Sequence, residues 1–395
     1  MRFSEIAGET GIFVDGDWIE KKDQDAKGAV RLIQLADVGP GEFRDKSDRH
    51  ITVEKADELH CTFLRKGDIL IARLGDPLCK ACVFPLDGLY ITAVDVAILR
   101  IGSDVVNPKY LIYLLNSPWF KDQVKQYESG TTRKRISRKN LDRIEMIFPP
   151  LPEQQRIVAR IEELFSQLDA GVEMLKKTKA QLAVYRQAVL KEAFSCCAEK
   201  KPIREMSSIV TSGSRGWAKY YCDNGAKFIR IGNLTRNKIY IDLDDIQHVQ
   251  LPDKAEGTRT KLAPNDVLVS ITADLGSIGL VPNGIGEAYV NQHIAMIRFN
   301  NQMQGEFYAW YLRSEYGQQD LLRNKRGGGK LGLGLDDIRD SRVPVVSNET
   351  AESILSIIEC RLSVCDSIEH TVDLALQQAE AMRQSILKDA FEGRL

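Results

Sequence analysis

The stretch that decides the fold occurs twice, as RQAVLKEAF at residues 186–194 and as RQSILKDAF at residues 383–391. Six of the nine positions are identical, and 197 residues separate the two copies. Similarity at a fixed period indicates that one structural unit is repeated along a chain. The chain has 395 residues, so this period is close to half of its length. We therefore predict a tandem duplication.

Other segments support the duplication, because they pair at nearly the same separation. Each half then follows one plan: short apolar runs broken by Gly, Pro and Asp, which are typical of strands and turns, followed by a short helical stretch. We expect the helical stretches at residues 108–124 and 305–322. The matching segments are residues 67–72 with 265–270, 96–100 with 294–298, and 30–35 with 229–234.

Each half is predicted to end in a long helix. The prolines at residues 149–152 exclude helix before them, and the last of them suits a first helical turn. Apolar residues then recur every seven positions, which is typical of a coiled coil. We expect an antiparallel pair, because the second globular segment must bridge the two helices. The predicted seam consists of Ile161, Leu168, Leu175, Leu182 and Val189 in the first helix and Ile358, Ile368, Val372 and Ile386 in the second.

The expected fold class is therefore α+β, with two tandem β-rich domains separated by two long helices packed as an antiparallel coiled coil, in a pseudo-twofold internal repeat. Ordinary core packing within one α-rich domain is the alternative for the helices. The predicted boundaries are residues 1–150 for the first β-rich domain, 151–195 for the first helix, 196–346 for the second domain and 347–395 for the second helix.

Composition argues against several classes of protein. No apolar run is long enough to span a bilayer, and no signal-like segment begins the sequence, so we expect a cytoplasmic protein. Cys79 and Cys82 have half of a zinc-ligand spacing, but no second pair completes it. Residues 324–331 lack the first glycine and the final hydroxyl of a phosphate-binding P-loop. The five histidines show no metal or base spacing. We predict neither a catalytic centre nor a metal or cofactor site.

Local charge favours nucleic acid even though the net charge is only −1. Eight basic and three acidic side chains lie between Lys121 and Arg143, and glycine and threonine precede the densest part. Glycine with basic residues recurs at residues 323–330. Arginine and lysine reach phosphates and base edges, although a solvated charged loop is the simpler alternative. The predicted DNA-contacting residues are Arg73, Thr131, Thr132, Arg133, Lys134, Arg135, Arg138, Lys139, Arg323, Lys325, Arg326, Gly328 and Lys330.

With this plan in place, the chain resembles the specificity subunits of type I restriction–modification systems. The resemblance rests on FPPLPEQQRIV at residues 148–158, LKEAF at residues 190–194 and AFEGRL at residues 390–395. It implies that each β-rich domain is a target recognition domain that reads one half of a split double-stranded DNA site. It also implies that the helices set the spacer and dock two methyltransferase (modification) subunits, which carry S-adenosylmethionine, and that restriction subunits using ATP and Mg²⁺ join the full complex.

The second half departs from this pattern. Residues 343–350 read VPVVSNET in place of the proline-rich string, so the start of the second helix is less clearly marked. Three alternatives remain open: the specificity subunit of another bipartite, type II-like system, a coiled-coil scaffold that binds proteins, and a self-contained methyltransferase. The last would need a methyl-donor cradle, and the sequence shows none.

Overall fold

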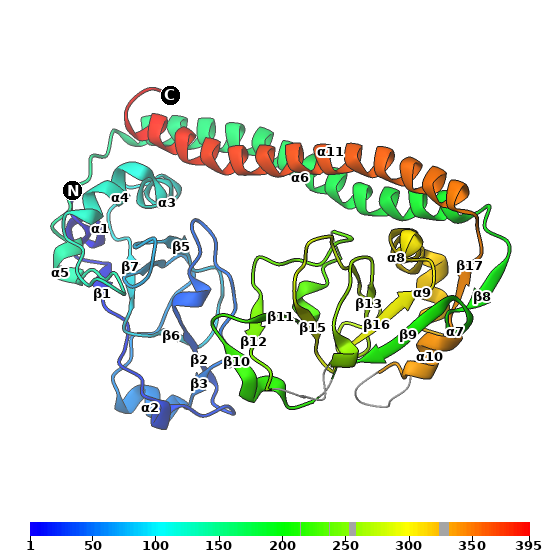
Figure 1. Cartoon of the computed structure of the whole chain (residues 1–395). Coiled ribbons are helices and arrows are strands. Elements are labelled where there is room, and N and C mark those ends of the chain that lie inside the picture. Colours follow the sequence, from blue (N-terminus) through cyan, green and yellow to red (C-terminus); the bar gives the residue numbers. More distant parts are fainter. Residues whose placement is uncertain (214, 237, 253–257, 324–331) are drawn as a thin grey trace. The chain divides into compact units, whose positions relative to one another are not determined.

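The computed structural model separates into two compact units, and each unit contains half of both long helices. Unit 1 comprises residues 1–175 and 374–395, and unit 2 comprises residues 176–373. The two units share one architecture (Figure 1). The structure describes residues 1–213, 215–236, 238–252, 258–323 and 332–395.

Unit 1 is built on two small sheets. The larger has the strand order β1-β7-β4-β5, and all of its neighbouring strands are antiparallel. In the smaller, β2 pairs antiparallel with β3 and parallel with β6. The strands are β1 (Ile12–Val14), β2 (Val30–Ile33), β3 (His50–Ile51), β4 (Ile69–Ala72), β5 (Ala81–Val83), β6 (Tyr90–Thr92) and β7 (Val96–Arg100), with short helices α1 (Phe3–Ala7) and α2 (Val53–Glu58).

Unit 2 repeats both sheets. Its larger sheet has the order β14-β13-β16-β9, and β11 pairs antiparallel with β12 and parallel with β15, as β2 does with β3 and β6. The duplication predicted from the sequence is thus confirmed as a fold. The elements are β8 (Lys200–Pro202), α7 (Ile203–Met206), β9 (Ser207–Ser212), β10 (Tyr221–Cys222), β11 (Ala226–Ile229), β12 (Gln247–Val249), β13 (Val267–Ser270), β14 (Ile278–Leu280), β15 (Ala288–Val290), β16 (Ile294–Phe299) and β17 (Arg342–Pro344).

One predicted segment match is out of register. The sequence paired residues 30–35 with 229–234, but strand β2 corresponds to β11, which ends at Ile229. A single 3₁₀ turn follows each strand and ends at Asp37 in unit 1 and at Asn233 in unit 2. The two segments can be aligned in two ways that differ by three residues, and both alignments place apolar residues opposite apolar residues. Side-chain similarity therefore favoured the wrong one.

A buried ion pair recurs at the same place in both larger sheets. Arg100 donates from Nε and Nη2 to the two carboxylate oxygens of Asp68, at 2.8 and 2.7 Å. Arg298 grips Asp266 in the same way, at 2.8 and 2.6 Å. Both aspartate side chains are 1% exposed. Because two-point contacts between arginine and carboxylate have strict geometry, each pair fixes how the central strands pack.

The predicted single helical stretches are each broken in two. Buried Ser117 ends one helix and caps the next, since its Oγ accepts the backbone N–H of Phe120. Ser314 does the same in unit 2 with Gly317. The helices are α3 (Pro108–Asn116), α4 (Pro118–Lys125) and α5 (Arg138–Leu141) in unit 1, and α8 (Gly305–Arg313), α9 (Glu315–Leu321) and α10 (Leu335–Asp340) in unit 2.

The long helices are α6 (Leu151–Phe194) and α11 (Asn348–Phe391), each of 44 residues. In unit 1 the start of α6 and the end of α11 pack on α3, and in unit 2 the end of α6 and the start of α11 pack on α8 (Figure 1). The pair is therefore antiparallel. Ile161, Leu182, Val189, Ile358 and Val372 are buried, and Leu168, Leu175 and Ile386 are partly buried.

Ile368 needs a correction, because its side chain is 40% exposed and lies off the seam. On α11 the buried companions follow four residues after the apolar heptad positions, as Leu362 does after Ile358, and not three. A spacing of three and a spacing of four both place residues on neighbouring faces of a helix, so the sequence alone did not separate them.

Ion pairs also join the two helices, and the acid and the base of a pair stand on opposite helices in the two units. In unit 1, Asp169 on α6 pairs with Arg383 on α11. In unit 2, Arg186 on α6 pairs with Asp366 on α11, at 2.6 Å. Each residue of one pair stands 197 positions from its counterpart in the other. The repeat therefore extends to contacts between the two helices.

The two long helices start differently. Buried Gln154 donates to the carbonyls of Val105 and Pro149 and accepts the N–H of Asn107, each at 2.8 Å. In unit 2 the amide belongs to a residue outside the long helix, since Gln304 donates to the side chain of Asn348 at 2.9 Å. Ser347 also caps α11, because its hydroxyl accepts the N–H of Thr350. These contacts explain how the second helix begins without the proline-rich string. Among the described residues, no helix is long and apolar enough to cross a membrane.

Candidate nucleic-acid interface

The densest basic segment of unit 1 forms a tight hairpin loop. The backbone N–H of Ser129 donates to the carbonyl of Arg135 at 2.9 Å, and the reverse bond is 2.8 Å. The loop is tied to the end of β4, because the N–H of Gly75 donates to the carbonyl of Lys134. Gly130 has φ +90°, and a Cβ there would lie 2.4 Å from the carbonyl oxygen of Arg133. Its glycine is thus required by the turn itself, whatever binds there.

Several basic side chains of this loop and of α5, which follows it, are exposed and form no ion pair with a described residue. Arg133, Arg135 and Lys139 are exposed, and no ion pair joins them to any described residue. Thr131 and Thr132 are exposed beside them. We define these five residues as the basic loop surface. Guanidinium and ammonium groups in this state can bind phosphate oxygens without first breaking a bond within the protein.

Two other predicted residues are partly neutralised by carboxylates. Lys134 lies 3.2 Å from Glu128. Arg138, at the start of α5, lies 3.4 Å from Asp15 and donates to the carbonyl of Phe13. Their net contribution to an attractive field is therefore smaller than the sequence count indicates.

Arg73 occupies a structural position. Its side chain is 12% exposed, pairs with Asp15 at 3.0 Å, and donates to the carbonyls of Val94 and Ile136. These bonds join the end of β4 to the segment before α5. We therefore leave Arg73 out of the proposed contact surface, since its guanidinium is committed to the fold.

The second predicted loop is described only at its edges. Arg323 is exposed and lies 4.0 Å from Asp320. Gly332 bridges to Thr272 as Arg135 does to Leu74 in unit 1, so the described residues that follow the two segments occupy matching places in their units. Lys325, Arg326, Gly328 and Lys330 lie outside the described residues.

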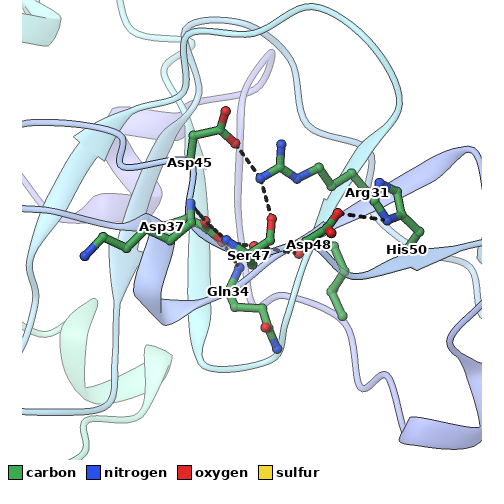
Figure 2. Close-up of polar contacts among 9 residues, drawn as sticks. Arg31, Gln34, Asp37, Asp45, Ser47, Asp48 and His50 are labelled. Atoms are coloured by element: carbon green, nitrogen blue, oxygen red, sulfur yellow. Dashed lines mark hydrogen bonds and ion pairs between the residues drawn. The ribbon is translucent and has the colours of Figure 1, made fainter. Parts of the chain in front are cut away.

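A second loop of unit 1 was missed by the sequence reasoning. Figure 2 shows Asp37 at its centre, where the carboxylate accepts the N–H groups of Gln34, Lys46 and Ser47 at 2.6 to 2.7 Å and the hydroxyl of Ser47. Arg31 pairs with Asp45 and donates to the carbonyl of Ser47. This network orders a loop on which Lys46 and Arg49 are exposed. Alternating charges hid it, because no run of one sign marks the segment.

The pKa of the Asp37 carboxyl follows from this network. Burial alone would raise it, but the hydrogen bonds from Ser47, Gln34 and Lys46 together outweigh burial and lower the pKa below its ordinary value of 3.8. Asp37 is therefore ionised at neutral pH and acts as an acceptor only. At the matching place, Asn233 accepts one N–H and donates to the carbonyls of Asp242 and Asp245.

The thiols have a different environment from that of metal ligands. Cys79 and Cys82 are buried in the core of unit 1, and burial raises the pKa of each to about 12. A protonated thiol in an apolar core is an inert packing group. Among the residues that the structure describes, no group of three or more potential ligands could hold a metal ion.

Comparisons with known proteins agree with this architecture. The family of the type I restriction modification DNA specificity domain matches residues 11–183 and 199–378. The EcoBI specificity subunit of Escherichia coli is 24% identical over 327 residues, which are 75% of this chain and 68% of that protein. The StySPI specificity subunit of Salmonella potsdam is 25% identical, over 73% of this chain and 66% of that protein. The aligned regions thus take in about two thirds of these relatives.

A solved structure shares the fold. Its subject is complex assembly and conformational transition of the type I restriction–modification system, and one chain superposes with a TM-score of 0.69 at 17% identity, covering all of this chain and 97% of that one. The family match spans both halves of the sequence. The chain therefore belongs to the family of type I restriction–modification DNA specificity subunits. Its function is DNA specificity, as a non-catalytic component of such an enzyme.

Proposed function

We propose that the β-rich part of each unit reads one half of a split DNA site and that α6 and α11 hold the two readers at a set separation. The observation that carries the proposal is the same strand order built twice, each copy packed on its own half of one antiparallel helix pair. Two similar recognition domains on a stiff helix pair suit a DNA target made of two short base sequences. A helix of 44 residues is about 66 Å long at 1.5 Å per residue.

The basic loop surface is the proposed phosphate contact of unit 1. Its charges are exposed and unpaired among the described residues, whereas Lys134 and Arg138 already face carboxylates. Phosphate contacts fix the register of a reader on the duplex, and base contacts then supply sequence preference. The Asp37-ordered loop, with Lys46 and Arg49, is a second proposed contact.

The proposed catalytic partners are two methyltransferase subunits that carry S-adenosylmethionine, joined in the full complex by restriction subunits that use ATP and Mg²⁺, in the cytoplasm where the DNA lies. Docking is proposed on an exposed apolar stripe of α11. Ile357, Val364 and Ile368 are 48%, 56% and 40% exposed and fall on one side of the helix. Exposed apolar side chains that recur on one helix face mark a surface for protein contact.

Domain exchange tests the reading of half-sites. Residues 1–150 are replaced by the first domain of another family member, and methylated bases are mapped genome-wide in cells that hold the complete complex. The expected result is a motif in which one half changes and the other half and the spacer stay. A change in both halves would contradict independent readers.

A matched set of variants tests the basic loop surface in the same complex. Arg133→Ala, Arg135→Ala and Lys139→Ala together remove about three phosphate contacts, so the slope of log affinity against log salt should fall by about 3. Lys125→Ala is the control, because Asp122 already offsets that charge at 2.7 Å. Unchanged affinity and slope in the triple variant would place the DNA elsewhere and favour a protein-binding role for this loop.

A further inference from the structure

Unit 2 contains a partly buried arginine that forms no ion pair with a carboxylate among the described residues. Arg313 ends α8, and its Nη1 atom is buried without a hydrogen-bond acceptor among the described residues. The guanidinium lies 5.6 Å from the ring centroid of Trp310, whose own Nε1 is buried and equally unsatisfied. Two unsatisfied buried donors on neighbouring turns are unusual, because native structures satisfy nearly all such groups.

The charges that reach Arg313 increase the imbalance. Burial, followed by repulsion from Arg186 and Arg236, lowers the pKa of Arg313 to about 10. The nearby acids are engaged with other bases: Glu369 lies 2.9 Å from Arg186, and Glu315 lies 3.0 Å from Lys191. An isolated charge removed from water is costly unless a partner of opposite sign compensates it.

Two adjoining cavities open beside Arg313. One, of about 250 Å³, is lined by Lys179, Arg186, Arg236, Trp310 and Arg313, with Glu369 among its walls. The other, of about 390 Å³, shares Arg236, Arg313 and Gln187. These side chains come from α6, from α8, from α11 and from the segment between β11 and β12. Of the cations in these walls, Lys179 pairs with Asp373, Arg186 with Asp366 and Arg236 with Asp274. Arg313 is the one that has no carboxylate partner among the described residues.

Unit 1 provides an internal comparison. The position that matches Arg313 is Asn116, which is neutral and buried. Its amide donates to the carbonyls of Ala81 and Ile112 at 2.9 and 2.8 Å, and its oxygen accepts the N–H of Ala81. The fold therefore does not need a charge at this place. Unit 2 carries a charge there, and the Nη1 of Arg313 has no acceptor among the described residues.

From these observations we infer that unit 2 binds a small phosphate-type oxyanion, as free phosphate or as the phosphate of a nucleotide, between Arg313 and the Nε1 of Trp310, in the cavity that Arg236 also lines. Arginine forks match the oxygens of a phosphate group in geometry as well as in charge. Such a ligand would lie between α8 and the cavity walls provided by α6 and by the segment around Arg236. Binding would stiffen the junction of the recognition part with the helices in unit 2, and unit 1 has no matching site.

Thermal unfolding of the full chain tests this inference with two probes, sodium phosphate and adenosine monophosphate, each against sodium chloride at equal ionic strength. The wild type should show a saturable rise in Tm of about 2–4 °C with one or both probes. Binding of phosphate alone would show that the cavity excludes a nucleoside, and binding of both would identify the phosphoryl group as the feature recognised. No rise with either probe over chloride would overturn the inference.

Variants locate the site. Arg313→Asn installs the residue of unit 1, and it should abolish the rise without lowering the Tm measured in chloride. Arg342→Asn, at an exposed arginine of the same unit, should keep the rise. Trp310→Phe removes the Nε1 donor alone and should weaken phosphate binding several-fold in a phosphorus NMR titration. Full phosphate binding in both Arg313→Asn and Trp310→Phe would reject the site.

Discussion

Units 1 and 2 share the buried fork between an aspartate and an arginine, but they attach their long helices through different polar groups. The forks of Asp68 with Arg100 and of Asp266 with Arg298 agree to within 0.1 Å in both paired contacts. The amide at the helix start, by contrast, comes from α6 in unit 1 and from the residue before α8 in unit 2. The sheet frame is thus the constant part of the repeat, and the junction with the helices is the part that has diverged.

The largest effects are expected where the units agree. Asp68→Asn and Asp266→Asn each leave a poorly solvated arginine without its counter-charge, which should cost about 3–5 kcal/mol. Hydrogen exchange measured by mass spectrometry should show faster exchange in β4 and β7 for the first variant, and in β13 and β16 for the second. Similar losses in the two units would support a common frame. A stability loss of less than about 1 kcal/mol for one of the two variants would show that the two ion pairs are not equivalent.

Smaller and unequal effects are expected at the helix starts. Gln154→Ala leaves the N–H of Asn107 and the carbonyls of Val105 and Pro149 without their partner, at a cost of about 2–3 kcal/mol. Gln304→Ala should cost roughly half as much, because Ser347 also caps α11. Hydrogen exchange of the backbone amides in the first turns of α6 and α11, measured by mass spectrometry, checks this prediction. Equal losses of stability in the two variants would show that the two helix starts depend equally on their glutamine.

The smallest difference is expected between Asp37 and Asn233, and it depends on pH. Asp37→Asn replaces one acceptor oxygen with an NH2 group, which cannot accept the surrounding N–H donors. The substitution should lower the stability by about 1–2 kcal/mol at pH 7. The lowered pKa of Asp37 stabilises the fold fully above the ordinary value of 3.8, and this contribution is lost as pH falls through the lowered, folded-state value. The Tm gap between the wild type and Asp37→Asn should therefore narrow between pH 5 and pH 2, which thermal unfolding can follow. A gap that stays constant would show that Asp37 does not titrate there.

Much of the frame was predictable from the sequence, because it depends on repeated local patterns. Heptads, prolines and two near-identical nonapeptides indicated the long helices, and apolar runs at a constant separation indicated the paired strands. The register of β2 against β11 was not predictable, since a shift of three residues kept apolar positions aligned. The side of α11 that holds Ile368 was likewise hidden, because two helix spacings fitted the sequence equally well.

The candidate site was less accessible, because charge in a sequence does not show which charges are already paired. Arg73 and Arg133 look alike as letters, yet the first is bonded to Asp15 and two carbonyls and the second is exposed. Lys46 and Arg49 stand among acidic neighbours and gave no signal until Asp37 was seen to order their loop. Only packing separates a structural arginine from one free to bind.

The exchange of Asp169–Arg383 for Arg186–Asp366 between the helices carries a consequence for ancestry. Each residue of one contact is the copy of a residue in the other, but on the opposite helix. Two identical half-length polypeptides meeting face to face would make both contacts from a single aspartate and a single arginine, as self-complementary dimers do. Gene fusion would then have freed the two copies to drift apart, one toward Asn116 and the other toward Arg313.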